Sequence, residues 1–256
     1  MRRNRTKLYI LLTQLFLGLF FFFLWEILAY TEVINAFLVS KPSSIIKLFI
    51  SYISSNKLLP HLLISTYETV VALVLSTTLG IAISLVLYNF PLVQLILDPY
   101  LTILNSLPKS SLGPIIIIIL GTSSKGIIGV SISLSIIITI ITSLDAFNKT
   151  DLDLKKMFIS LGANKRQILA KLIIPSSFDS LLSIVKVNIG LSWVGTIVGE
   201  FLVSKQGIGY LLVYGAQVFK LDLVMMGIIV LSLISLSMYE LVNFLQKIYR
   251  KKTHIK

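Results

Sequence analysis

The chain has 256 residues, of which 55% are hydrophobic and 13% are charged, and its mean hydropathy is +0.92. This composition excludes a water-soluble globular domain, in which about a quarter of the residues are charged. The net charge of +12 does not indicate nucleic-acid binding, because the basic residues gather at both ends and in one central segment between apolar runs. The chain has no cysteine, and His61 and His254 stand far apart, so we expect no metal site.

Apolar runs long enough to cross a bilayer as helices follow one another along the chain. The first run, residues 8–30, follows a basic start but is too long for the core of a signal peptide, so we expect it to be retained. Residues 42–55 are expected to form a short helix lying at an interface. The later spans are expected at residues 62–88, 92–120, 126–147, 178–203 and 223–248. The sequence therefore predicts an all-α, polytopic membrane protein with about six transmembrane helices.

The third predicted span, residues 92–120, contains Pro99, Pro108 and Pro114. Proline removes a helical hydrogen-bond donor and clashes with the preceding turn, so this span should be kinked or broken. No repeat of the solenoid type divides the chain, and residues 1–256 are expected to form a single transmembrane domain.

The distribution of basic residues predicts the orientation. Placing both termini in the cytoplasm puts 15 of the 23 lysines and arginines inside and 6 outside. This is the bias that the positive-inside rule favours, and it makes residues 148–176 the main cytoplasmic loop.

The loop 148–176 is expected to form a helix, a turn and a second helix. Apolar residues at i, i+3, i+4 and i+7 indicate the first helix, which Gly162 can end by taking the left-handed conformation. Asn164 suits the N-cap of the second helix, and Gln167 completes a capping-box pattern. Pro175 interrupts this helix or marks the entry to the fifth span. The segment is either a basic anchor on anionic lipid or a docking surface for a cytoplasmic partner.

Ionisable residues inside predicted spans are candidate functional groups, because burying them in lipid is costly. Glu200 follows Trp193 by two helical turns, so the two share one face of the fifth span. Glu200, Trp193, Ser192 and Glu68 are candidates for the translocation pathway or its gate; packing alone is the alternative. An acid near the pathway does not require a cationic solute, because Lys186 or another chain can neutralise it.

Three stretches follow a family pattern: "LGANKRQILAKLIIPSS", "LDPYLTILNSLPKSSLGPIIIIILGTSSK" and "GLSWVGTIVGEFLVSKQGIGYLL". Gly162 and Pro175 have the spacing of the first pattern, but Lys156 stands where the pattern has a glutamate. The stretches resemble the EAA loop, the third-span region and the block after the loop of ABC importer permeases. The resemblance covers about residues 65–242. It points to the branch that imports sulfonates, taurine, nitrate and similar anions, which includes permeases for riboflavin and thiamine-precursor pyrimidines.

The resemblance implies the fold of a type I ABC importer permease in the cell membrane of a prokaryote. The partners that it implies are two ATP-binding subunits, an extracellular solute-binding protein and a second permease copy. The cytoplasmic loop would then be the coupling helix, which sits in a groove on the ATPase. The residues on which this coupling is expected to depend are Leu161, Gly162, Ala163, Asn164 and Pro175.

The chain is not expected to be an enzyme. The nearest match to a phosphate-binding loop, "GTSSKGIIG", lacks the required order of glycines and lysine, so ATP and Mg²⁺ are expected on a separate subunit and no cofactor on this chain. Two other functions compete with the importer. One is a secondary transporter driven by an ion gradient, with Glu68 or Glu200 as proton carrier, and the other is a membrane scaffold that moves no solute.

Overall fold

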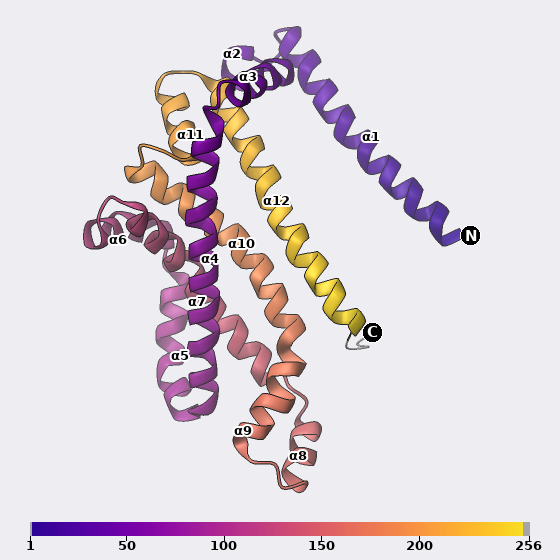
Figure 1. Ribbon diagram of the computed structural model, residues 1–256, viewed down its shortest axis with the longest axis vertical. Coiled ribbons are helices and arrows are strands. Elements are labelled where there is room, and N and C mark those ends of the chain that lie inside the picture. Colours follow the sequence, from indigo (N-terminus) through magenta and orange to yellow (C-terminus); the bar gives the residue numbers. More distant parts are fainter. Residues whose placement is uncertain (1, 253–256) are drawn as a thin grey trace. The chain divides into compact units, whose positions relative to one another are not determined.

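The computed structural model describes residues 2–252, and every regular element in that range is helical (Figure 1). In chain order these are α1 (Arg2–Tyr30), α2 (Ala36–Val39), α3 (Pro42–Ser54), α4 (Leu58–Asn89), α5 (Pro91–Ser106), the 3₁₀ turn η1 (Lys109–Leu112), α6 (Gly113–Leu120), α7 (Ser124–Asn148), α8 (Leu152–Ser160), α9 (Lys165–Ile168), the π turn η2 (Leu169–Ile173), α10 (Ile174–Val203), α11 (Ile208–Gln217) and α12 (Leu221–Lys252). The all-α prediction is confirmed. Residues 253–256, in the predicted cytoplasmic tail, lie outside the described residues.

Five helical stretches within the described residues are long and apolar enough to cross a membrane. They are Leu12–Tyr30, Leu58–Asn89, Ser124–Asn148, Lys165–Val203 and Leu221–Arg250. A sixth span results if the bent pair Pro91–Ser106 and Lys109–Leu120 crosses as one. The predicted set of about six spans therefore has a helical counterpart at each position.

The third predicted span is broken in the structure, as its prolines indicated. Its two helical parts are bent by 89° relative to each other, and Pro108 lies between them. Figure 1 shows the two parts as α5 and α6. Leu107 has the extended backbone that a residue before proline favours. Pro114 is tolerated at the start of α6, where its missing N–H costs nothing, and Pro99 remains inside α5.

The chain forms two compact units. Unit 1 comprises Met1–His61 with Leu211–Leu231, and unit 2 comprises Leu62–Tyr210 with Ser232–Lys256. The expected single domain stays a prediction, as does the interfacial position of α3.

In unit 1, a carboxylate of α1 completes the start of α3. Lys41, the N-cap residue of α3, makes no side-chain cap. Glu26 instead accepts hydrogen bonds from the Ser43 amide at 3.0 Å and from the Ser43 hydroxyl at 2.8 Å. An acid at a helix N-terminus accepts hydrogen bonds from amides that lack a partner, and its negative charge interacts favourably with the helix dipole. Glu26 therefore has a structural role.

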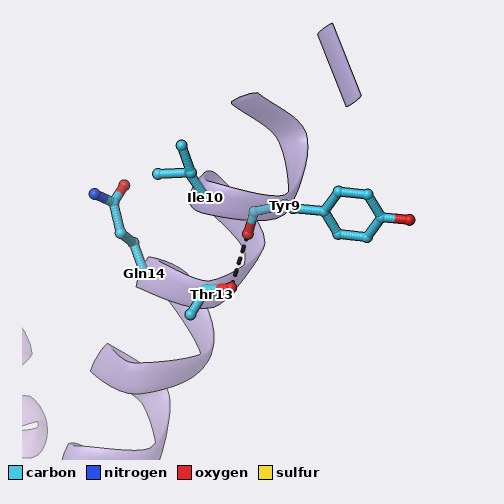
Figure 2. Close-up of a pocket in the computed structure, with 4 residues that line it drawn as sticks. All are labelled: Tyr9, Ile10, Thr13 and Gln14. Atoms are coloured by element: carbon cyan, nitrogen blue, oxygen red, sulfur yellow. Dashed lines mark hydrogen bonds between the residues drawn. The ribbon is translucent and has the colours of Figure 1, made fainter. Parts of the chain in front are cut away.

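The surface of α1 bears a shallow hollow of about 350 Å³ lined by Tyr9, Ile10, Thr13 and Gln14 (Figure 2). Thr13 donates its hydroxyl to the Tyr9 carbonyl at 2.8 Å, which satisfies this short polar side chain within the helix. Tyr9 and Gln14 point to different sides of the helix (Figure 2). Because consecutive turns of one helix form the whole wall, the hollow is a gap between side chains on an apolar helix.

Unit 2 is built on close packing of α7 against α10. A Cβ at Gly195 would collide with the Ser131 backbone, and a Cβ at Gly199 would lie 3.0 Å from Ile127 Cα. The small residues thus allow the helices to approach closely, as such residues do in membrane bundles. Asn188, which is fully buried, ties the helices further by donating to hydroxyls of α4 and α7.

Candidate functional site

The loop that the sequence places in the cytoplasm forms a short helical elbow, α8 followed by α9. Asp151 caps the start of α8 by accepting from the Asp153 amide at 2.8 Å. At its end, Gly162 has φ +81°, its amide donates to Ile159, and the Ala163 amide donates to Phe158. These two bonds form a Schellman motif, which requires the left-handed conformation that glycine tolerates. The predicted helix end at Gly162 is confirmed.

The second arm of the elbow starts with the predicted capping box. The Gln167 amide donates to Asn164 Oδ1 at 2.9 Å, and the Asn164 amide donates to Gln167 Oε1 at 2.8 Å. Two amides that a helix start leaves without partners are thereby satisfied. Lys165 and Arg166 follow at once and are exposed, so the turn presents a fixed basic surface.

The apolar stripe of α8 is largely exposed. Leu161 is 76% exposed and Met157 is 47% exposed, whereas Phe158 is half-buried. Apolar side chains next to a basic turn, outside the apolar spans, form a surface that a protein partner can cover. This surface favours the docking interpretation over a simple charge anchor.

The elbow is attached to the core of unit 2. Ile168, Leu172 and Ile173 are buried against Phe147 of α7, and Phe158 and Ala163 pack on the same cluster. Apolar contacts from both sides of the turn thus attach the elbow to the α7–α10 core.

A further contact ties α8 to α4. Lys155 donates to the Tyr88 hydroxyl at 3.2 Å, and the Tyr88 ring packs edge-on against Phe147 at 6.0 Å. The elbow thus has a polar as well as an apolar attachment to unit 2.

Pro175 does not end the helix after the elbow. The preceding residues widen into the π turn η2, in which the Ile174 amide bonds to the carbonyl of Leu169, five residues back. The wider turn gives the proline ring room where a regular helix would clash with the carbonyl four residues earlier. The fifth span therefore runs without interruption from Lys165 to Val203, a longer stretch than the expected 178–203.

Lys156, which replaces an acid of the family pattern, forms an ion pair with Asp153 at 3.1 Å. Both side chains are well exposed and belong to the same helix, so the pair contributes little to stability. The pair shows how the chain accommodates a lysine here.

The buried carboxyl of Glu200 fastens the turn after α10. It accepts the Ser65 hydroxyl at 2.5 Å and the Gly209 amide at 2.5 Å. Ser65 in turn accepts the Ile208 amide at 2.7 Å. Gly207, with φ +106°, lies so close to Glu200 that a Cβ there would collide with the carboxyl. Gly207 and Gly209 thus shape the turn, because a Cβ at either position would collide with Glu200.

Glu68 lies close to Glu200, and the two buried carboxyl groups differ in their partners. Glu68 is 1% exposed and approaches Ser124 and Glu200. Its Oε2 atom has no hydrogen-bond partner among the described residues. Thr69, one residue on, bonds to Thr196 of α10 at 3.1 Å, which holds α4 against α10 at this level.

Trp193 and Ser192 are buried in the same helix as Glu200. Ser131 of α7 donates to the Ser192 carbonyl at 2.9 Å. The structure therefore brings the four candidate pathway residues to the packed region of α4, α7 and α10. Their role in a pathway stays a prediction.

Two features were not found by sequence reasoning. Ser65 carries no signal of its importance, because a single serine in an apolar run is common. Of the two suggested partners of Glu200, Lys186 is wrong, because it donates to Asn243 at 3.0 Å and to Gln246, both on α12. Such pairs join helices that are far apart in sequence, so only the three-dimensional structure reveals them. Pairing of Glu200 with another chain stays a prediction.

Among residues 2–252, no three or more histidine, aspartate or glutamate side chains are grouped so that they could hold a metal ion. The polar groups that the structure brings together are carboxyl, hydroxyl and amide groups. Such groups can hold a turn in place through hydrogen bonds, and they can also accept hydrogen bonds from a solute.

The chain is similar in sequence to several permeases of known assignment. A permease assigned to aliphatic sulfonate transport in Bacillus subtilis is 25% identical over 88% of this chain and 81% of its own length. A formylaminopyrimidine transport permease of Halalkalibacterium halodurans is 28% identical over 73% of this chain and 74% of its own. The taurine transport system permease of Escherichia coli is 23% identical over 68% and 64%.

These relatives are transport permeases rather than enzymes. The family described as binding-protein-dependent transport system inner membrane component matches residues 76–255, which include the elbow, the Glu200 turn and all of α12. The matched part covers more than half of the chain. The chain is therefore a member of this family of ABC transporter permeases, integral to the inner membrane.

Proposed function

We propose that the chain is the membrane-spanning subunit of an ATP-driven importer, which moves a small solute delivered by an extracellular binding protein. The observation that carries the proposal is the exposed, capped elbow around Gly162 in a chain of this family. A rigid surface element joined to the core of a transport permease fits the part that receives force from an ATPase.

The elbow would act as the coupling helix. The ATPase subunit covers Leu161 and the turn through Asn164, and closure of two ATPases on ATP and Mg²⁺ pushes two such elbows together. The apolar cluster around Phe147 supports this mechanism, because it lets α7 and α10 follow the elbow as one body. A permease homodimer, two ATP-binding subunits and one binding protein complete the proposed assembly.

The proposed orientation has both termini in the cytoplasm, since the basic elbow then lies on the side of the ATPases. The turn at Glu200 then lies on the external side, where the solute enters. The relatives' names suggest a sulfonate or taurine-like anion, or a vitamin precursor such as a formylaminopyrimidine, as solute.

The test replaces Gly162 by valine in the complete transporter, reconstituted in liposomes with its ATPase and binding protein. A branched residue at φ +81° costs about 1–2 kcal/mol and distorts the elbow. We expect ATP hydrolysis to continue while uptake of the relatives' solutes falls by about tenfold or more, as loss of coupling implies. Both rates are measured in one preparation.

Gly18→Val is the matched control, because Gly18 lies inside α1 with open space around its Cα and no positive φ. Uptake should stay within about twofold of the unchanged protein. If Gly162→Val imports as much solute per ATP as the control, the elbow does not couple. If uptake needs no ATPase and is abolished by uncouplers, the chain is a secondary transporter.

A further inference from the structure

A polar pocket of about 380 Å³ lies within unit 2 beside Glu68. The segments that meet there are one face of α4, the turn before and at the start of α7, and the turn after α10. The residues that line it are Ile64, Glu68, Thr122, Ser123, Ser124, Ile127, Val203, Ser204, Lys205 and Gln206. Thr122 and Ser123 are exposed, so the pocket has an accessible rim.

Glu68 lines this pocket and approaches Ser124 and Glu200, but one of its carboxyl oxygens lacks a hydrogen-bond donor within the described part of the chain. The residue is 1% exposed, yet its Oε2 has no hydrogen-bond partner among the described residues. Burial of a carboxyl oxygen without a donor is costly, so natural structures avoid it unless the site has another use. The neighbouring Glu200 shows the contrast, because a hydroxyl and a backbone amide satisfy it.

Other residues that line the pocket supply a positive charge and hydrogen-bond donors, in contrast to the acceptor at Glu68. Lys205 contributes a cation, Thr122 and Ser123 contribute hydroxyl groups, and α7 begins at Ser124 without a side-chain cap. Helix N-termini and lysines favour anionic groups. The pocket therefore offers an acceptor at Glu68 and donors at its rim.

We propose that this pocket binds a small zwitterionic solute, with Glu68 accepting a hydrogen bond from its ammonium group and the rim around Lys205 facing its anionic end. The inference rests on the proposed import function, and it adds the chemical class of the solute and a contact residue. A divalent cation fits less well, since it needs six or more oxygen ligands and Lys205 would repel it.

The experiment uses the natural absence of cysteine. Ser123→Cys places one thiol in the pocket of the full-length chain in its membrane, and the neutral reagent N-ethylmaleimide labels it. The rate is compared with methylammonium, with 2-aminoethanesulfonate, and with ethanesulfonate, which lacks the amine. We expect both amines to slow labelling, by about tenfold at ten times their Kd, and ethanesulfonate to have no effect.

Two further variants make the result specific to Glu68. Adding Glu68→Gln to Ser123→Cys should abolish protection by both amines, and Glu68→Asp should restore part of it. Ser54→Cys, exposed on α3, is the control that no solute should protect.

Equal protection by ethanesulfonate would overturn the proposal, as would protection that survives Glu68→Gln or an absence of protection by both amines. Should a Glu68 variant fail to fold, the comparison of amines with ethanesulfonate in Ser123→Cys alone still decides. The readout needs neither ATP nor uptake. A negative result in this labelling experiment is thus distinct from a failure of the proposed importer function, which the Gly162 variant tests.

Discussion

At the scale of single residues, Glu200 shows how one buried acid can define a turn. Its carboxyl receives a hydroxyl from α4 and an amide from the residues after α10, so three segments meet at one group. The glycines at 207 and 209 leave the space that this approach needs. A larger side chain at either position would separate the turn from the helix.

Gly207→Ala tests this arrangement. The backbone there has φ +106° and a Cβ would meet the Glu200 carboxyl, so we expect a loss of about 1–3 kcal/mol and a lower melting temperature of the purified permease. Gly190→Ala, on α10 with open space around it, should melt at or slightly above the unchanged protein. The account of the turn is wrong if both alanine variants melt alike.

At the scale of elements, the elbow consists of two helices whose ends are each fixed by local hydrogen bonds. The Schellman motif at Gly162 and the capping box of Asn164 need only residues close in sequence. The elbow should therefore keep its shape while a partner presses on its exposed Leu161.

Asn164→Ala should loosen this element. Loss of an N-cap costs about 1 kcal/mol, so amides of α9 should exchange with deuterium about fivefold faster. Ser160→Ala is the control, because that exposed hydroxyl bonds only to a carbonyl of its own helix. Unchanged exchange in Asn164→Ala would show that tertiary packing alone holds the second arm.

The elements that sequence predicted well are those with short-range causes. Glycine, the cap pair and Pro108 act on their neighbours in the chain, and the structure has the turn, the capping box and the bend where they were expected. The contacts of Ser65 and of Lys186 depend on helices far apart in sequence, and hydrophobic periodicity carries no information about which helix faces which. The π turn was missed for a related reason, because Pro175 alone permits either a break or a wider turn.

At the scale of the whole molecule, the basic elbow and the Glu200 turn lie at opposite ends of the long helix that runs from Lys165 to Val203. A helix of this length exceeds the thickness of the hydrocarbon core. Force applied at the elbow and solute entering near Glu68 would therefore act on opposite sides of the membrane.

Two single-cysteine variants test this topology. In the cysteine-free chain, a membrane-impermeant maleimide should label Ser54→Cys in intact cells, because the proposed orientation puts the exposed Ser54 outside. Ser160→Cys, in the elbow, should be labelled only after the cells are permeabilised. Labelling of Ser160→Cys in intact cells would reverse the orientation and place the basic elbow outside.

The π turn before Pro175 has a consequence for the alignment of the elbow. A π turn holds one more residue than an α turn for nearly the same rotation about the axis, whereas an extra residue in a regular α-helix would rotate everything before it by about 100°. The wider turn thus lets Leu161 and the basic turn face the direction that they would have in a regular helix one residue shorter. The direction in which the permease presents its basic surface is preserved because one turn takes up the additional residue.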